Sequence, residues 1–102
     1  MTKLPQITTM AELRLEIDRL DAALVDLLAQ RTAMIDRAIE LKPGEGLPAR
    51  IETRVEDVVT KVRARAIAAG LPPELAETLW REMMEFFIAR EEDVLGKGDD
   101  GE

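Results

Sequence analysis

The chain has 102 residues, 46% of them hydrophobic, and a formal net charge of −7. This length fits a single domain, and the acidic balance argues against nucleic-acid binding, which needs basic patches that contact phosphates repeatedly. Cysteine and histidine are both absent, which excludes disulfides, thiolate chemistry and the usual acid–base group near neutral pH. A metal site would have to consist of carboxylates alone, and no Glu-x-x-His or calcium-loop pattern is present, so we expect no metal and no cofactor.

The first predicted element is a long helix that begins near Met10. Thr9-Met-Ala-Glu12 has the form of a capping box, and neither Gly nor Pro interrupts the chain before Pro43-Gly44-Glu45-Gly46. A helix of about 32 residues is roughly 48 Å long, whereas a compact 100-residue monomer has a radius of gyration of about 13 Å. We therefore expect two copies to pack side by side as a homodimer. The apolar face of this helix consists of Leu13, Ile17, Leu20, Leu24, Leu28, Ile35 and Ala38.

Two cations interrupt this apolar face. At about 100° per residue, Arg31 falls roughly 20° from Leu24, and Lys42 falls almost on top of it. A buried cation without a partner costs several kcal/mol, so both side chains require an anion. That anion is either a protein carboxylate, with Glu91 as the candidate for a structural ion pair, or a bound ligand. The spacing leaves both alternatives open.

Two shorter helices are expected to follow. The second opens at Pro48 and ends at Gly70, and the third starts at Leu71-Pro72-Pro73-Glu74, with its proline and acid at the N-terminal end. No alternating pattern suggests a strand, so we expect an all-α domain over residues 1–95, with a flexible tail at 96–102. The apolar stripes are Ile51, Val55, Val58, Val62 and Ala66 in the second helix, and Leu75, Leu79, Trp80, Met83, Met84, Phe87 and Ile88 in the third.

Four basic residues lie on or beside the inward faces of these helices: Arg14, Arg31, Lys42 and Arg54. The planar arginine side chain binds a carboxylate with two hydrogen bonds, and lysine adds a mobile point charge. Together they suit a small molecule with two carboxylates, while Glu91, on the inward face of the third helix, is placed to give or receive a proton. Taken singly, Arg14 and Arg54 also fit solvated residues at the flanks of their helices.

The N-terminal sequence and the hydropathy predict where the protein resides. Met-Thr-Lys-Leu-Pro-Gln contains no apolar run of the kind found in a signal peptide. No segment approaches the roughly 18 consecutive apolar residues of a membrane span. We therefore expect a cytoplasmic protein with no membrane partner.

One set of residues carries a resemblance to a known family. The set comprises Leu13-Arg14-x-x-Ile17-Asp18-x-Leu20-Asp21, Leu27-Leu28-Ala29-x-Arg31, Lys42 and Arg54. This order, from Met10 to Glu92, resembles the all-helical type II class of chorismate mutases. The resemblance implies an intertwined homodimer of three-helix chains, in which each of two active sites uses the long helices of both subunits. The implied reaction is the [3,3] rearrangement of chorismate to prephenate, a step of the shikimate pathway toward phenylalanine and tyrosine.

The resemblance also implies a role for each candidate residue. Arg14 would reach into the site of the partner subunit and hold one substrate carboxylate, and Arg31 would hold the other. Lys42 would donate a hydrogen bond to the ether oxygen whose bond to carbon breaks. Arg54 would line the pocket, and Glu91 would lie on the other side of that oxygen. This rearrangement needs no proton transfer, only a near-attack conformer and donors aimed at the developing charge, which agrees with a chain that lacks histidine.

Three positions bear on which substrate is used. Mutases of this class usually carry acidic residues where this chain has Ile51 and Val55, whereas aliphatic residues there resemble the related isochorismate pyruvate lyases. We expect both to line the substrate pocket together with Phe87. Many members carry Gln in place of Glu91, and a carboxyl group must be protonated to donate to the ether oxygen, so we expect activity to rise toward acidic pH. The alternatives to a mutase are a salicylate-forming isochorismate pyruvate lyase and a non-catalytic helical dimer.

Overall fold

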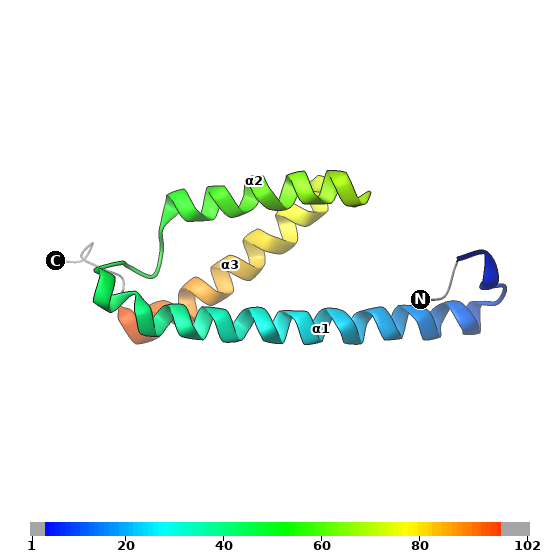
Figure 1. Cartoon of the computed structure of the whole chain (residues 1–102), viewed down its shortest axis with the longest axis horizontal. Coiled ribbons are helices and arrows are strands. Elements are labelled where there is room, and N and C mark those ends of the chain that lie inside the picture. The colour runs from blue at the N-terminus through cyan, green and yellow to red at the C-terminus, as the bar shows by residue number, and fades with distance from the viewer. Residues whose placement is uncertain (1–3, 97–102) are drawn as a thin grey trace. The chain divides into compact units, whose positions relative to one another are not determined.

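The computed structural model describes residues 4–96, so the tail predicted at 96–102 lies outside this range except for Gly96. The chain forms three α-helices, α1 (Met10–Leu41), α2 (Glu52–Ala69) and α3 (Pro73–Leu95), as Figure 1 shows. One short 3-10 helix, η1 (Leu4–Gln6), precedes α1, and another, η2 (Pro43–Glu45), lies between α1 and α2. Residues 4–96 contain no strand, which confirms the predicted all-α class. The chain falls into two compact units, one ending at Asp36 and the other beginning at Arg37. Within the described range, no helix is long and apolar enough to cross a membrane.

The start of α1 is fixed by the predicted capping box. The Thr9 hydroxyl oxygen accepts a hydrogen bond from the Glu12 N–H at 3.1 Å, and Glu12 Oε1 accepts one from the Thr9 N–H at 3.1 Å. The same carboxylate accepts bonds from the N–H and hydroxyl of Thr8, and these bonds, with the Thr8 N–H first, lower the pKa of Glu12. The first N–H groups of a helix have no acceptor within the helix. Here side-chain oxygens accept hydrogen bonds from such groups.

Substituting Thr9 tests this cap. Thr9→Ala is expected to lower the free energy of unfolding by about 1 kcal/mol, because the Glu12 N–H loses its acceptor. The change is measured by urea denaturation followed by circular dichroism at 222 nm. Thr8→Ala is the matched control, since it removes a hydroxyl that only donates to the exposed Glu12 carboxylate. Equal losses in the two variants would contradict the assigned cap.

The apolar face of α1 remains open to solvent in the single chain. No residue of α1 is buried, and the middle of the predicted stripe is exposed to an unusual degree. The exposed fractions are 45% for Ile17, 48% for Leu20, 57% for Leu24 and 43% for Leu28. The periodicity therefore predicted the helix correctly, but the chain itself does not bury the face that the periodicity defines.

The predicted start of the second helix at Pro48 is wrong, since α2 begins at Glu52. Ile51 is the N-cap residue with extended backbone angles, φ −125° and ψ 102°, and its carbonyl accepts the N–H bonds of Arg54 and Val55. Proline suits the first turn of a helix, but it is equally compatible with an extended connection. The end of the helix is as predicted, because Gly70 adopts φ 82° and its N–H bonds back to the last turn.

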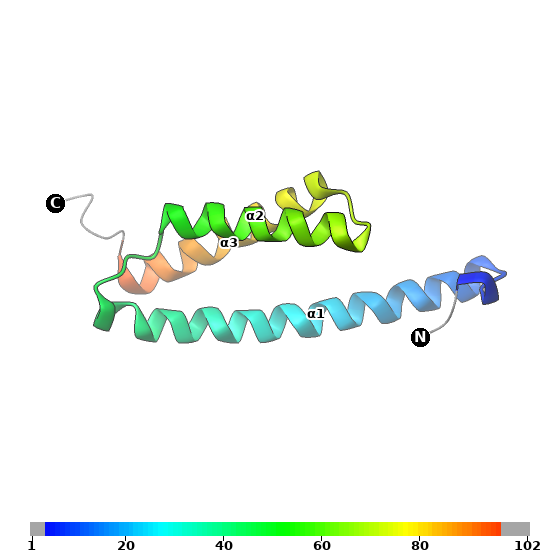
Figure 2. The same ribbon diagram turned by 45° about the horizontal axis from the view of Figure 1, so that its top comes forward.

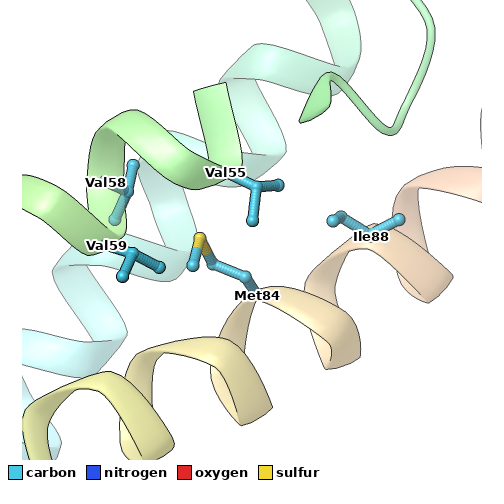
Figure 3. Close-up of a cluster of buried hydrophobic side chains, with 5 residues drawn as sticks. All are labelled: Val55, Val58, Val59, Met84 and Ile88. Carbon is cyan, nitrogen blue, oxygen red and sulfur yellow. The ribbon is translucent and has the colours of Figure 1, made fainter. Parts of the chain in front are cut away.

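In the C-terminal unit, α2 and α3 run antiparallel and pack against each other (Figure 2). Valines from α2 point toward Met84 and Ile88 of α3, as Figure 3 shows. Trp80 is partly buried at the edge of this cluster, whereas Leu79 of the predicted apolar stripe stays 50% exposed. The buried cluster consists of Val55, Val58, Val59, Met84 and Ile88.

Ion pairs join the same two helices on the outside of this cluster. Arg81 of α3 donates from both terminal nitrogens to Glu56 of α2, at 3.1 and 3.0 Å, and from Nε to Glu77 at 2.7 Å. Arg63 of α2 donates to the other oxygen of Glu77 at 2.8 Å. The hydrogen bonds from Arg81 are the main cause of a lowered pKa for both Glu56 and Glu77. Both carboxylates are therefore held in the ionised form.

This network predicts a loss of stability in acid. A carboxyl group with a lowered pKa in the folded state stabilises that state above the pKa of the unfolded chain, and the stabilisation disappears as the pH falls through the folded value. The urea midpoint is thus expected to change little between about pH 6 and about pH 5 and to fall as the pH drops below the ordinary glutamate pKa of about 4.3 toward about pH 3. In Glu56→Gln/Glu77→Gln the fall should be smaller. An unchanged pH dependence in that variant would show that other groups cause the acid sensitivity.

Candidate active site

Lys42 and Glu91 meet in the C-terminal unit, although 49 positions separate them in the sequence. Lys42 Nζ donates a hydrogen bond to Glu91 Oε1 at 2.6 Å and another to the Ala49 carbonyl oxygen at 2.8 Å. The Lys42 side chain is 16% exposed and the Glu91 side chain 5% exposed. The structural ion pair that the sequence left as one of two alternatives is therefore present, and it is largely shielded from water.

The backbone around Lys42 explains how its ammonium group meets a carbonyl oxygen. Lys42 directly follows α1, and its N–H still bonds to the Ala38 carbonyl at 2.9 Å. Its own carbonyl accepts the N–H bonds of Glu45 and Leu47, at 3.1 and 2.9 Å, so the chain turns tightly around this residue. Ala49 follows two positions after Leu47, at a bend in the non-helical connection, and is only 3% exposed. The connection thus returns to the lysine whose side chain it binds.

Glu91 lies on the buried face of α3. Met84, Ile88 and Glu91 are spaced at i, i+4 and i+7, which places them on one side of a helix, and all three are buried. Glu91 is the one charged residue in the buried set of the described chain, at 4% exposure. Burying a carboxylate without a partner is costly, and the Lys42 ammonium is the partner of this one.

The three apolar candidates lie in the same unit in different surroundings. Ile51 is half-buried at the N-cap of α2, and Val55, at 8% exposure, points into the cluster with Met84 and Ile88 (Figure 3). An acidic side chain in place of Val55 would enter this apolar cluster, so packing alone accounts for an aliphatic residue there. Phe87 is half-buried. That these residues line a substrate pocket stays a prediction.

The three arginine candidates are not gathered around Lys42 within the C-terminal unit. Arg54 is exposed at the surface of α2, where it donates to Asp57 at 2.7 Å, as the solvated-flank alternative expects. Arg14, which is exposed, and Arg31, which is half-buried, belong to the N-terminal unit. Their convergence on one substrate stays a prediction.

Two groups near Lys42 were not predictable from the sequence. The Ala49 carbonyl is a backbone acceptor, and no residue type marks such a group. Next to it, Arg50 donates two parallel hydrogen bonds to Glu85 of α3, at 2.9 and 2.5 Å. Arg50 and Glu85 are 35 positions apart, and the sequence around each of them is that of an ordinary solvated surface charge. Only the tertiary fold brings them together.

The arrangement is suited to binding negative charge on oxygen. A lysine ammonium has three N–H donors, of which two point at Ala49 and Glu91, so a third can be directed at a ligand oxygen. Among the residues that the structure describes, no group of three or more acidic side chains is placed to hold a metal ion. The central feature of the arrangement is the Lys42 ammonium, which two hydrogen bonds hold in place and which is shielded from water.

Most of the chain is similar to known proteins of one family. Residues 13–92 match the family described as chorismate mutase type II. The T-protein of Enterobacter agglomerans is 34% identical over 87 residues, a match that covers 85% of this chain and 23% of that protein. The chain thus spans about a quarter of the length of this relative. With most of its length matched, the chain belongs to the chorismate mutase type II family.

Proposed function

We propose that the chain catalyses the [3,3] rearrangement of chorismate to prephenate. The observation that carries this proposal is the Lys42 ammonium, 16% exposed and held 2.6 Å from Glu91 and 2.8 Å from the Ala49 carbonyl oxygen. In this rearrangement a carbon–oxygen bond breaks as a carbon–carbon bond forms, and negative charge develops on the ether oxygen. A shielded cation that is already in place stabilises this charge without reorganisation during the reaction.

The remaining residues act by positioning the substrate. Arg14 and Arg31 hold the two carboxylates of chorismate, Arg54 adds positive charge beside them, and the substrate is thereby folded into its near-attack conformer. Lys42 donates to the ether oxygen, and Glu91 adjoins the same atom from α3. No residue has to remove or deliver a proton. The absence of histidine is compatible with a reaction of this kind.

We also propose that the active form is a homodimer. The support comes from α1, whose apolar stripe of Ile17, Leu20, Leu24 and Leu28 is between 43% and 57% exposed in the single chain. A contiguous apolar surface of this kind is typical of a protein–protein interface. A second copy would cover the stripe and bring its Arg14 to the neighbouring site. Light scattering should then give twice the mass of one chain.

Mixing two inactive variants tests the shared site. Arg14→Ala and Lys42→Met each remove one residue from every site of their own dimers. After unfolding and refolding together, half of the dimers are mixed, and in each of them one of two sites regains both residues. The mixture should therefore recover about a quarter of the wild-type activity. Recovery of none would place Arg14 and Lys42 of one chain in the same site, and an Arg14→Ala protein that is itself fully active would place Arg14 in no site.

A product assay on two substrates tests the reaction itself. The purified protein is incubated separately with chorismate and isochorismate, and prephenate and pyruvate are quantified. We expect prephenate from chorismate. Pyruvate from isochorismate without prephenate would instead support the lyase, the alternative that the aliphatic Ile51 and Val55 suggested. If neither substrate reacts and Arg31→Ala changes nothing, the chain is a non-catalytic helical dimer.

A further inference from the structure

The connection between η2 and α2 carries a group of the active site. Its Ala49 carbonyl oxygen accepts a hydrogen bond from Lys42 Nζ at 2.8 Å, and together with Glu91 it fixes the direction of the ammonium group. Glu91 is held by a helix, whereas Ala49 lies at a bend in the non-helical connection between Gly46 and Ile51. The position of the Ala49 carbonyl therefore depends on the contacts between this connection and the rest of the C-terminal unit.

Arg50, the residue directly after Ala49, makes a contact that holds the connection in place. Its two terminal nitrogens donate to the two oxygens of Glu85, at 2.9 and 2.5 Å, so the planar guanidinium and carboxylate groups face each other. This two-bond geometry restrains orientation as well as distance. Arg50 also donates to Glu52 at 3.2 Å, but Glu52 is the first residue of α2, whereas Glu85 belongs to α3. The Glu85 contact therefore links the connection to the helix that carries Glu91.

We propose that Arg50 and Glu85 are positioning residues for Lys42, and that their paired hydrogen bonds hold the Ala49 carbonyl where it directs the Lys42 ammonium toward the substrate. This inference rests on the proposed mutase function. Both acceptors of the Lys42 ammonium are then linked to α3. Glu91 is part of this helix, and Ala49 is connected to it through Arg50 and Glu85. A shift of the connection by about 1 Å would misdirect the ammonium, and a misplacement of that size can cost about a hundredfold in rate.

A role confined to stability is distinguishable from this one. The Arg50 and Glu85 side chains are 37% and 59% exposed, and ion pairs at such sites contribute little to stability. Arg81 and Glu56 form a comparable two-bond pair between α3 and α2, with side chains 41% and 59% exposed. That pair binds no residue of the connection. It is therefore a matched control for a pair that merely holds the two helices together.

The kinetic test compares Glu85→Ala with the control Glu56→Ala. We expect Glu85→Ala to lower kcat for chorismate at least tenfold while KM stays within twofold, because the contact to the developing charge is weakened and the carboxylate contacts are kept. Glu56→Ala should keep both constants within twofold. Arg50→Lys should behave like Glu85→Ala, since lysine lacks the planar two-bond geometry. Equal changes in the Glu85 and Glu56 variants, or no change in either, would overturn the proposal.

A second measurement needs no turnover. Amide hydrogen exchange across residues 47–51, and the 15Nζ chemical shift of Lys42, are recorded for the same proteins by NMR. Glu85→Ala should speed exchange in this segment at least tenfold and shift the Lys42 signal, whereas Glu56→Ala should do neither. Unchanged exchange and an unchanged signal would refute the positioning role. If the wild type does not convert chorismate, the proposed function fails, and these two signals alone decide whether Arg50 and Glu85 position Lys42.

Discussion

Lys42→Met is expected to lower kcat by a factor of about 10²–10³ and the free energy of unfolding by about 3 kcal/mol. The rate falls because the substrate's ether oxygen loses the cation that stabilises its developing charge. The stability falls because Glu91, with a side chain only 5% exposed, is left as a buried carboxylate without the ammonium 2.6 Å away. Steady-state kinetics with chorismate and urea denaturation measure the two effects on the same protein.

A double substitution separates the two effects. In Lys42→Met/Glu91→Met both charges are replaced by apolar side chains of similar length, and such replacements of a whole buried pair are often neutral or stabilising. The free energy of unfolding should therefore return to within about 1 kcal/mol of the wild type, while kcat stays low. A double variant that recovers activity along with stability would show that Lys42 serves the fold and not the reaction.

The helices were predictable because local signals fix their ends. The reciprocal bonds of Thr9 and Glu12 begin α1 where the capping box predicted, and the left-handed Gly70 ends α2. The start of α2 was missed because Pro48 fits both a first helical turn and an extended segment. What decides between them is the backbone of Ile51, whose carbonyl becomes the first acceptor of the helix. No side-chain pattern encodes that choice.

The candidate site was predictable only where periodicity applies. The spacing of Glu91 from Met84 and Ile88 placed it on the buried face of α3, and the cation that meets it is one of the two that interrupted the α1 stripe. The acceptor on Ala49 and the pair of Arg50 with Glu85 were missed, since they arise from a non-helical connection. Such contacts depend on tertiary geometry and leave no periodic trace.

Glu91→Gln is expected to raise kcat at about pH 7.5 by roughly tenfold or more, up to the factor of about 10²–10³ that one donor to a developing oxyanion can contribute. An ionised Glu91 only accepts hydrogen bonds and takes one donor from Lys42, 2.6 Å away. Glutamine keeps an acceptor for Lys42 and offers an N–H to the ether oxygen at every pH. The matched control is Glu92→Gln, which removes the same charge one position further along α3.

The same comparison identifies the role of Glu91. If the group at position 91 donates to the ether oxygen, Glu91→Gln raises kcat, whereas Glu92→Gln leaves it unchanged. A lower kcat in Glu91→Gln would instead show that Glu91 works as the acceptor that fixes Lys42. In that case the negative charge beside the ether oxygen is tolerated because the ion pair already neutralises it.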